Sequence, residues 1–551
     1  MSKIKYALFI LLLALSFTDS IAQNAAETKK VKKLKIDELR NWQNLDLQQD
    51  SVPGISLNRL YNEFIKNKKG KEIIVAVIDS YIDLNHEDLK NQIWINKKEI
   101  PNNNIDDDKN GYVDDTNGWN FLGNKSGEST FRLNYDAARR LRNLLRKNVD
   151  TTNFNGNTID SLAYRYIQKE FQKLKVKHNS KIEDAKYYQD AYISSFKRID
   201  NIFNNKPFSL KQIDSLFKLR EFDATDELYY DMYFVRDFIK TNNNKAWIDL
   251  FEERVVGELS TSLNANFNEN DIIKDIERNL DDKNYGNNKV SHYSNKTWHS
   301  TMMSGMIAAN RKDNAGIQGF GNQIKVMPLV ISAASGTHRD KDIALAIEYA
   351  VNNGAKVINM SFGKSTPIYP EWIQKFILYA KENDVLIVVS AGNSNENLDT
   401  KYSYPNDYFS EKDAVEFVDN LIVVGGINHE ANENLVYKYS NFGKKNVDIM
   451  APATDIWCLD PLRNYALDDG TSFAAALTSG SAALIRSHHP KLTANQVKNI
   501  ILESGVTIDQ KVIKPGTENE MVPFSVLCKS GKILNVYNAM KMAKEVSKKK
   551  K

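Results

Sequence analysis

Short apolar runs rich in β-branched residues alternate with amphipathic stretches along much of the chain. The runs lie at 73–78, 356–360, 385–389 and 421–424, and each is shorter than a typical helix. Strands that are apolar on both faces lie inside parallel sheets that helices cover on both sides. Helical spacing of apolar residues appears at 342–352, 371–382 and 474–488. The alternation predicts an α/β fold with three layers and a mostly parallel central sheet.

The segment 123–284 has a different pattern. Helical spacing recurs at 137–147, 159–174, 182–203, 210–220 and 227–240, and asparagine-rich breaks such as 242–244 separate the stretches. We therefore predict a large all-helical insertion that splits the α/β domain into 71–122 and 285–543. The insertion contains no cysteine and one histidine, His178, so we expect no metal site in it. An N-terminal extension, 23–70, and a basic tail, 544–551, flank the domain.

Residues 1–22 have the features of a signal peptide. Lys3 and Lys5 precede an apolar run from 7 to 17, which is too short to span a hydrocarbon core of roughly 30 Å. Small residues at Ser20 and Ala22 favour cleavage after Ala22. We expect export to the periplasm or the medium, with an uncleaved membrane anchor as the alternative. No later stretch has the length and apolar character of a membrane span.

Composition excludes several classes of protein. The 551 residues are 42% hydrophobic and 26% charged, which rules out a disordered or fibrous chain. Lys and Arg number 74 against 70 Asp and Glu, a balance that argues against a dedicated nucleic-acid binder. Cys458 and Cys528 are too few for a disulfide scaffold or a cysteine-rich zinc module, and their pairing is left open. We expect a monomer.

Three segments place reactive side chains next to predicted strands or helices. Asp79 follows the run 73–78, and sites of α/β proteins lie at such carboxyl ends of strands. His299 opens a helix of small and apolar residues, where an imidazole can act as a base near pH 7. Ser472 follows Gly470 at the start of another helix, whose dipole favours negative charge on a nucleophilic oxygen. Taken singly, the three have plainer interpretations as a turn or cap, a structural histidine and a helix cap.

Together, the order Asp79, His299, Ser472 with these flanking residues resembles the subtilases, the subtilisin-like serine proteases. The run 354–363 is similar to the substrate-binding strand and turn of that family. The run 390–393 is similar to its oxyanion-hole segment, and 440–443 and 448–452 are similar to its turns before the nucleophile. The resemblance covers 71–122 and 285–543. More specifically, the chain resembles a subgroup of large exported bacterial subtilases that have a helical insert between the Asp and His motifs.

The resemblance implies a subtilisin-like fold and an exported serine endopeptidase that acts on protein or peptide substrates. Ser472 would attack the peptide carbonyl, His299 would move the proton, and Asp79 would orient the imidazole. Asn393 and the Ser472 N–H would bind the oxyanion. The implied substrate-binding residues are Ser361, Phe362, Gly363, Ala391 and Gly392. The chemistry requires no cofactor.

Four positions depart from the family pattern. Tyr81 replaces a glycine, Ser300 and Met302 replace a glycine and a second histidine, and Ala476 replaces a proline. Because glycines near a site often serve a positive φ or a close backbone approach, Tyr81 and Ser300 could shift the Asp79–His299 geometry. An alternative function is therefore a catalytically impaired protein that binds peptides or partners without cleaving them. In a further alternative, the insertion is an interaction module and the protease carries it.

The run 106–115 has the spacing of a calcium loop. Asp106, Asp108 and Asn110 occupy alternate positions before a glycine, and Asp114 could supply a further ligand. Asn117 stands where the usual distal glutamate would be. A structural calcium ion is the cofactor that this pattern suggests, and an acidic surface turn is the alternative.

Overall fold

The computed structural model describes residues 34–66, 68–146, 159–219, 226–292, 299–311, 316–410, 413, 415–461 and 464–549. The predicted signal peptide, 1–22, lies outside the described residues.

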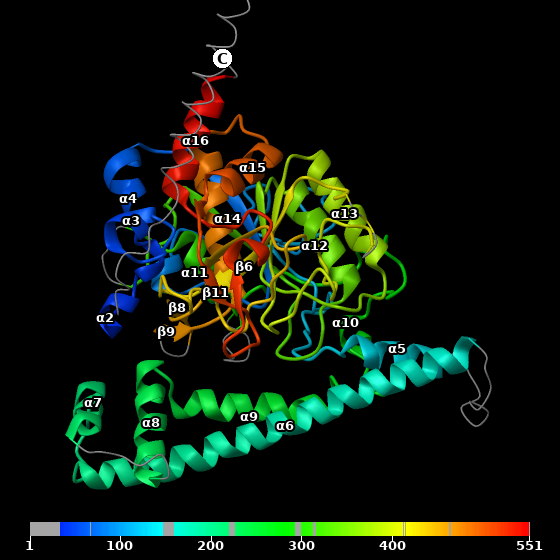
Figure 1. Ribbon diagram of the computed structural model, residues 1–551. Helices are drawn as coiled ribbons and strands as arrows, with labels where there is room; N and C mark the ends of the chain where they lie inside the picture. The colour runs from blue at the N-terminus through cyan, green and yellow to red at the C-terminus, as the bar shows by residue number, and fades with distance from the viewer. Residues whose placement is uncertain are drawn as a thin grey trace, which may run out of the picture.

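A nine-stranded sheet forms the centre of the fold (Figure 1). Its strands are β1 (Ile73–Asp79), β2 (Trp119–Asn120), β3 (Ile324–Val330), β4 (Val357–Met360), β5 (Leu386–Ser390), β6 (Leu421–Ile427), β7 (Ile449–Pro452), β10 (Val506–Thr507) and β13 (Lys532–Ile533). The spatial order is β10-β13-β7-β6-β5-β4-β1-β3-β2. All neighbouring pairs are parallel except β10 and β13. The predicted α/β fold is confirmed, and the four apolar runs are β1, β4, β5 and β6.

Helices cover both faces of the sheet. On one side lie α11 (His299–Ala308) and α14 (Thr471–His488), and on the other α12 (Asp340–Asn352) and α13 (Pro370–Glu382) (Figure 1). α14 is buried along nearly its whole length, because its Ala, Ser and Gly residues allow close packing. A Cβ atom at Gly480 would lie 2.2 Å from Phe320 Cδ2, so a larger side chain does not fit there.

The N-terminal extension packs into the main core. Its elements are α2 (Ile36–Leu39), η1 (Trp42–Asn44), α3 (Leu47–Asp50), α4 (Leu57–Leu60) and η2 (Tyr61–Ile65). Trp42 is fully buried and donates from Nε1 to Thr454 O at 3.0 Å. Asn535, at the start of α16 (Val536–Lys548), donates to Ser56 Oγ at 2.8 Å. The extension therefore shares one core with the C-terminal helix, and α16 runs on through the first residues of the expected tail.

Smaller elements complete the α/β part of the molecule. They are η3 (Glu87–Leu89), α15 (Ala494–Ser504), η5 (Phe524–Val526), and two hairpins: β8 (Ile456–Asp460) with β9 (Asn464–Asp468), and β11 (Lys511–Ile513) with β12 (Met521–Pro523). None of the helices in the described ranges is both long and apolar enough to cross a membrane.

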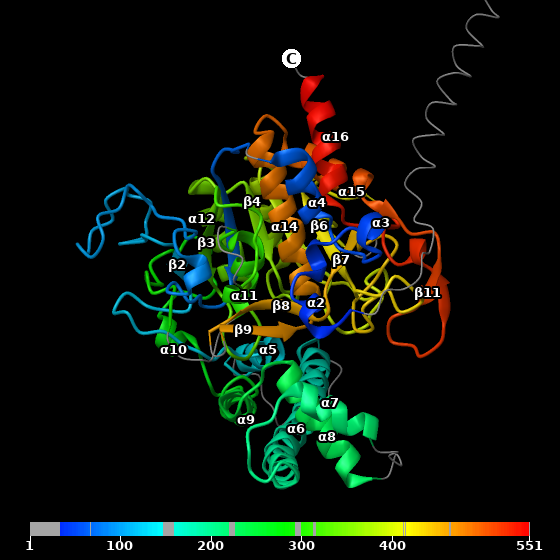
Figure 2. The ribbon, with the colours of Figure 1, turned by 90° about the vertical axis from the view of Figure 1, so that its left-hand side faces the viewer.

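The insertion forms a helical arm along the face that carries β8 and β9 (Figures 1 and 2). Its helices are α5 (Asp136–Leu145), α6 (Ile159–Ile202), α7 (Leu210–Leu219), α8 (Glu227–Lys240), α9 (Lys245–Ser260) and α10 (Asn270–Ile273). The prediction of separate helices at 159–174 and 182–203 is wrong, because α6 is one helix of 44 residues, about 66 Å long. The intervening residues, 175–181, contain no glycine or proline to end it.

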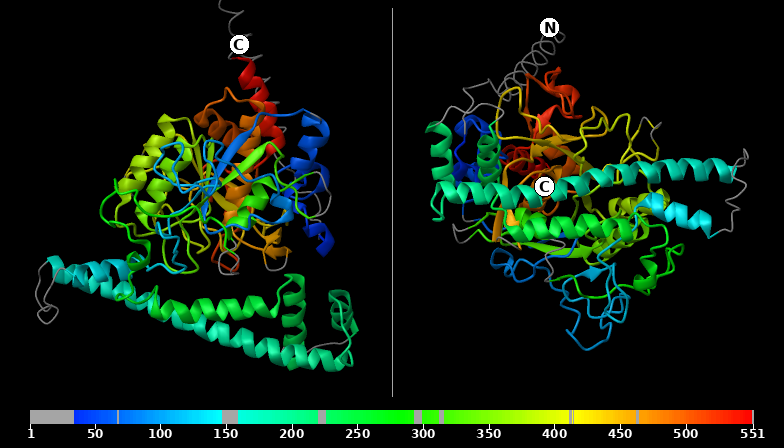
Figure 3. Two further views of the ribbon diagram at one scale, coloured as in Figure 1. Left: turned by 180° about the vertical axis from the view of Figure 1, so that it is seen from behind. Right: turned by 90° about the horizontal axis from the view of Figure 1, so that it is seen from below.

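The arm contacts the core at both ends. At the base, buried Lys364 binds Asp136 of α5 at 2.9 Å and Asp340 of the core at 2.6 Å. At the far end, Lys240 of α8 binds Asp455 at 2.7 Å. Figure 3 shows α6 crossing this face from side to side between the two contacts. The arm also has two hydrophobic clusters of its own, separate from the main core.

Candidate active site

Asp79 is the last residue of β1, between β3 and β4 at the carboxyl end of the sheet. Its side chain is nearly buried, and its Oδ1 accepts a hydrogen bond from Ser80 N at 2.6 Å. The main-chain oxygen of Asp79 accepts from Ile331 N at 2.9 Å and from Ser332 N at 3.1 Å. These bonds fix the carboxylate at the edge of the sheet.

His299 begins α11 and faces that carboxylate. Its Nδ1 lies 2.8 Å from Asp79 Oδ2 and 3.0 Å from Oδ1. Because an ionised carboxylate only accepts, Nδ1 carries the proton and Nε2 of the neutral ring is left as the acceptor. Burial lowers the pKa of His299, but the charge and hydrogen bond of Asp79 outweigh it, and the pKa is raised above its usual value. The side chain is 40% exposed, so it remains open to a substrate.

Ser472 is the second residue of α14 and lies in the same cleft as His299. Its Oγ donates to Ser361 O at 3.2 Å, and in the described part of the chain no hydrogen bond joins it to His299. Catalytic hydrogen bonds of this kind often form only once a substrate is bound. The Ser472 N–H is one of the unpaired amides of the first helical turn, which suits it to bind an anion.

Asn393 is held by Thr471, the neighbour of Ser472. Its Oδ1 accepts from Thr471 N at 2.9 Å and from Thr471 Oγ1 at 3.0 Å. Since a main-chain N–H can only donate, the amide orientation is fixed and Nδ2 points away from Thr471. Asn393 lines the cleft, and among the described residues nothing accepts a hydrogen bond from Nδ2. The structure thus leaves two N–H donors, Asn393 Nδ2 and Ser472 N, for an oxyanion.

Asn441 holds the loop that carries Asn393. Its Nδ2 donates to Ala391 O at 2.8 Å, and its Oδ1 accepts from Ser394 N at 3.0 Å and Glu396 N at 2.9 Å. Gly392 has a φ of +101°, and a Cβ atom there would lie 2.6 Å from Asn441 Nδ2. Both conformation and space therefore require glycine at 392.

The segment 361–363 follows β4 and borders the cleft. Ser361 and Phe362 line the cleft, whereas Gly363 lines a neighbouring cavity of about 270 Å³ between this segment and helices α5 and α6. In the described part of the chain no hydrogen bond uses the main-chain groups of Phe362 or Gly363. They form an open edge to which an extended peptide can add as a strand. Ala391 and Gly392, expected as pocket walls, are not among the residues that line the cleft.

The departures from the family pattern leave the Asp79–His299 contact intact. Tyr81 is buried, packs against Phe131 with ring centroids 5.3 Å apart, and does not have a positive φ. Ser300 also lacks a positive φ, and its N–H donates to Ser80 Oγ at 3.1 Å. Met302 lines the cleft, and Ala476 is buried in α14. Neither position 81 nor position 300 has the positive φ that would require a glycine.

The cleft measures about 420 Å³ and includes residues that the sequence analysis missed: Arg254, His338, Asp468 and Asp469. Burial and the charge of Lys364 lower the pKa of His338 to about 4, so this imidazole is neutral at neutral pH. Burial and the nearby carboxylates raise the pKa of Asp469 to about 6. No sequence motif marks these residues, because three different segments bring them together.

The predicted calcium loop forms part of an acidic cluster. Carboxylate oxygens of Asp106, Asp108 and Glu99 lie within 4.8 Å of one another. Glu99, which the sequence analysis missed, is 6% exposed, and its Oε2 has no hydrogen-bond partner among the described residues. Burial and the negative charges of Asp115 and Asp108 raise the pKa of Glu99, because both disfavour its ionised form.

The side chains of two further predicted ligands, Asp114 and Asn110, accept hydrogen bonds from main-chain N–H groups. Asp114 accepts from Asn103 N at 3.1 Å and Asn104 N at 3.0 Å, and so stabilises a turn. Asn110 Oδ1 accepts from Tyr112 N at 2.8 Å. The three remaining carboxylates are hard oxygen ligands of the kind that calcium prefers.

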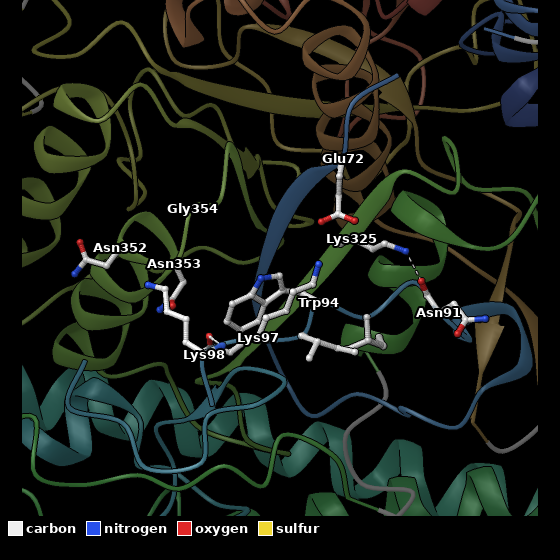
Figure 4. A pocket seen from close by; sticks show the side chains of 12 residues that line it. Glu72, Asn91, Trp94, Lys97, Lys98, Lys325, Asn352, Asn353 and Gly354 are labelled. Atoms are coloured by element: carbon white, nitrogen blue, oxygen red, sulfur yellow. Dashed lines mark hydrogen bonds between the residues drawn. The ribbon is translucent and has the colours of Figure 1, made fainter. Parts of the chain in front are cut away.

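A separate cavity of about 540 Å³ lies at the amino ends of β1 and β3 (Figure 4). Figure 4 shows Glu72, Trp94 and Lys325 around it, and none of the predicted site residues line it. It is on the wrong edge of the sheet to serve Asp79. Cys458 and Cys528 are both buried, and no disulfide joins them to each other in the structure.

Comparison with known proteins places these residues in context. A family model described as "Subtilase family" matches residues 70–521. The chain is 30% identical over 220 residues to the cell wall-associated protease of Bacillus subtilis (strain 168), a match that covers 40% of this chain and 22% of that protein. It is 29% identical over 210 residues to subtilisin DY of Bacillus licheniformis, covering 38% of this chain and 70% of that protein.

Solved structures give similar but partial matches. The prenylagaramide maturation protease PagA is 26% identical, with 44% of this chain and 82% of that chain covered and a TM-score of 0.35. The subtilase cytotoxin SubAB is 23% identical, with coverage of 45% and 77% and a TM-score of 0.37.

Proposed function

The chain belongs to the subtilase family, and from this membership we propose that it is an exported serine endopeptidase that hydrolyses peptide bonds through an acyl-enzyme. The observation that carries the proposal is the 2.8 Å contact between Asp79 and His299 in the cleft that also holds Ser472. Export rests on the leader-like sequence of residues 1–22.

In this mechanism the Ser472 oxygen attacks the carbonyl carbon of an extended peptide paired with the 361–363 edge. For this, the hydroxyl turns from Ser361 O toward His299 Nε2, which takes its proton. Asp79 holds the ring and stabilises the imidazolium that forms. The tetrahedral oxyanion receives hydrogen bonds from Asn393 Nδ2 and Ser472 N.

The intermediate then collapses. The C–N bond breaks, and the leaving amine takes the proton from His299. Water, deprotonated by the same imidazole, attacks the acyl carbon. The bond from this carbon to Ser472 Oγ then breaks, the acid leaves, and Ser472 Oγ takes the proton back from His299. The chemistry uses only this chain's own groups.

Labelling of the purified mature protein with a fluorophosphonate probe tests the proposal, with Ser472→Ala as the control. We expect stoichiometric labelling that the control loses, because the probe reacts with serines activated by a base. Folded protein that takes up no label would contradict it. That result would favour the alternative in which the Ser472 hydroxyl stays on Ser361 O and the cleft binds peptides without cleaving them.

We further propose that Glu99, Asp106 and Asp108 bind one structural calcium ion. The buried and unpartnered Glu99 Oε2 is the observation that supports it. The loop leads into β2 at the edge of the sheet, so an ion there stabilises the fold and takes no part in the chemistry.

A further inference from the structure

Among the described residues of the helical arm, one side chain lines the cleft that holds Asp79, His299 and Ser472. Arg254 of α9 lines the cleft together with residues of the core such as His299, Ser361 and Ser472. Through Arg254 the arm is therefore part of the surface that a substrate meets.

The position of Arg254 is fixed by a second arginine. Arg132 donates from Nη1 to Arg254 O at 2.7 Å and from Nη2 to Glu253 O at 3.1 Å. Its Nη1 also reaches Ser335 Oγ at 3.4 Å, and Ser335 is hydrogen-bonded to Ser262 at 2.6 Å. Ser335 directly follows the residues 332–334 that line the cleft. The end of α9 is thus fastened to one wall of the site.

The guanidinium of Arg254 is available to a ligand. Among the described residues no carboxylate lies within ion-pair distance of it, and its Cζ lies 5.5 Å from the ring centroid of Phe251. Among the described residues of the cleft, the other charged side chains are carboxylates: Asp79, which pairs with His299, and Asp468 and Asp469, which are close in sequence to Ser472. An acidic group would therefore find one favourable position in an otherwise anionic cleft.

We propose that Arg254 makes the cleft selective for peptides with an aspartate or glutamate side chain close to the scissile bond. This inference rests on the proposed endopeptidase function. A guanidinium binds a carboxylate through two parallel N–H···O bonds, and the partly enclosed site strengthens such a pair relative to the open surface. The helical insertion would then set substrate preference for a catalytic centre built entirely by the core.

Matched peptides that carry Glu or Gln at one position on either side of the scissile bond test the inference. The mature enzyme is compared with Arg254→Ala, Arg254→Glu and the control Arg236→Ala, an arm arginine that pairs with Asp214 and does not line the cleft. We expect kcat/KM to favour Glu about 10-fold at one position, equivalent to about 1.4 kcal/mol. Arg254→Ala should abolish the preference, Arg254→Glu should reverse it in favour of Gln, and Arg236→Ala should leave it unchanged.

The outcomes separate this inference from the proposed function. If the peptides are cleaved but the Glu:Gln ratio is the same in the mature enzyme and Arg254→Ala, the inference is overturned and the endopeptidase stands. If no peptide is cleaved, the endopeptidase fails, and fluorescence anisotropy of the same labelled peptides then decides. Selective binding of Glu peptides that Arg254→Ala loses would support the role of Arg254, and equal binding would overturn it. A preference confined to the free C-terminal carboxylate would also overturn it.

Discussion

Replacing Thr471 with valine removes one hydroxyl beside the nucleophile and leaves the shape of the side chain nearly unchanged. That hydroxyl accepts from Gly392 N and donates to Asn393 Oδ1, each at 3.0 Å. Thr471 is fully buried, so water cannot replace the lost bonds. Asn393 Oδ1 keeps only the bond from Thr471 N, at 2.9 Å, and its amide becomes less firmly oriented.

The magnitude follows from the bonds that are lost. A buried hydrogen bond contributes about 1 kcal/mol net, and one oxyanion donor contributes about 3–4 kcal/mol to kcat. Loosening the donor without removing it should cost about 1.4 kcal/mol, a 10-fold loss of kcat. KM should stay within about twofold, because the hydroxyl does not touch substrate.

A double-mutant cycle in peptide hydrolysis measures this effect. We expect Asn393→Ala to lose about 10²–10³ in kcat, and Thr471→Val to have no additional effect in that background. Thr471→Ser, which keeps the hydroxyl, should behave as wild type. An equal loss from Thr471→Val in both backgrounds would refute the reasoning, since the hydroxyl would then act elsewhere than on Asn393.

Three further predictions concern pH, calcium and stability. Only the neutral imidazole of His299 accepts a proton, and its pKa is raised, so kcat/KM should fall as the pH is lowered through a value above 6.5. Asp79→Asn should shift this acidic limb of the pH–rate profile to lower pH and reduce kcat about 10⁴-fold. An acidic limb that does not shift would contradict the assignment. Calcium at about 20 times its Kd should stabilise the protein by about 2 kcal/mol in thermal unfolding, and Glu99→Gln should abolish this effect. Equal stabilisation of the Glu99→Gln variant by calcium would contradict the calcium proposal. Lys364→Met should lower the free energy of unfolding in urea by about 3 kcal/mol, because it leaves the buried carboxylate of Asp340 without an ion pair and removes one of the two cations that Asp136 binds. Lys548→Met on the surface should change it little, and equal effects would argue against the buried ion pairs.

The sequence predicts the sheet and the order of its reactive residues well, for local reasons. β1 is a run of β-branched residues that ends at Asp79, and α14 is a helix rich in small residues that has Ser472 as its second residue. Both signals lie within one element, so no tertiary information is needed to find them.

The parts that the sequence does not predict depend on contacts between distant segments. Arg254 reaches the cleft only because Arg132 ties α9 to Ser335, and Glu99 joins the acidic loop from outside its motif. α6 is also longer than expected, because a weakly apolar stretch inside a helix resembles a break when its packing partners are unknown.

Mass spectrometry of the intact protein and of its proteolytic peptides, after mixing with an activated ester, tests most directly the central claim that Asp79 and His299 activate Ser472. The account predicts that one acyl group accumulates on the peptide that contains Ser472, and that His299→Ala and Ser472→Ala each abolish it. An acyl group on Ser472 that persists in His299→Ala, or none on the wild-type protein, would contradict the account.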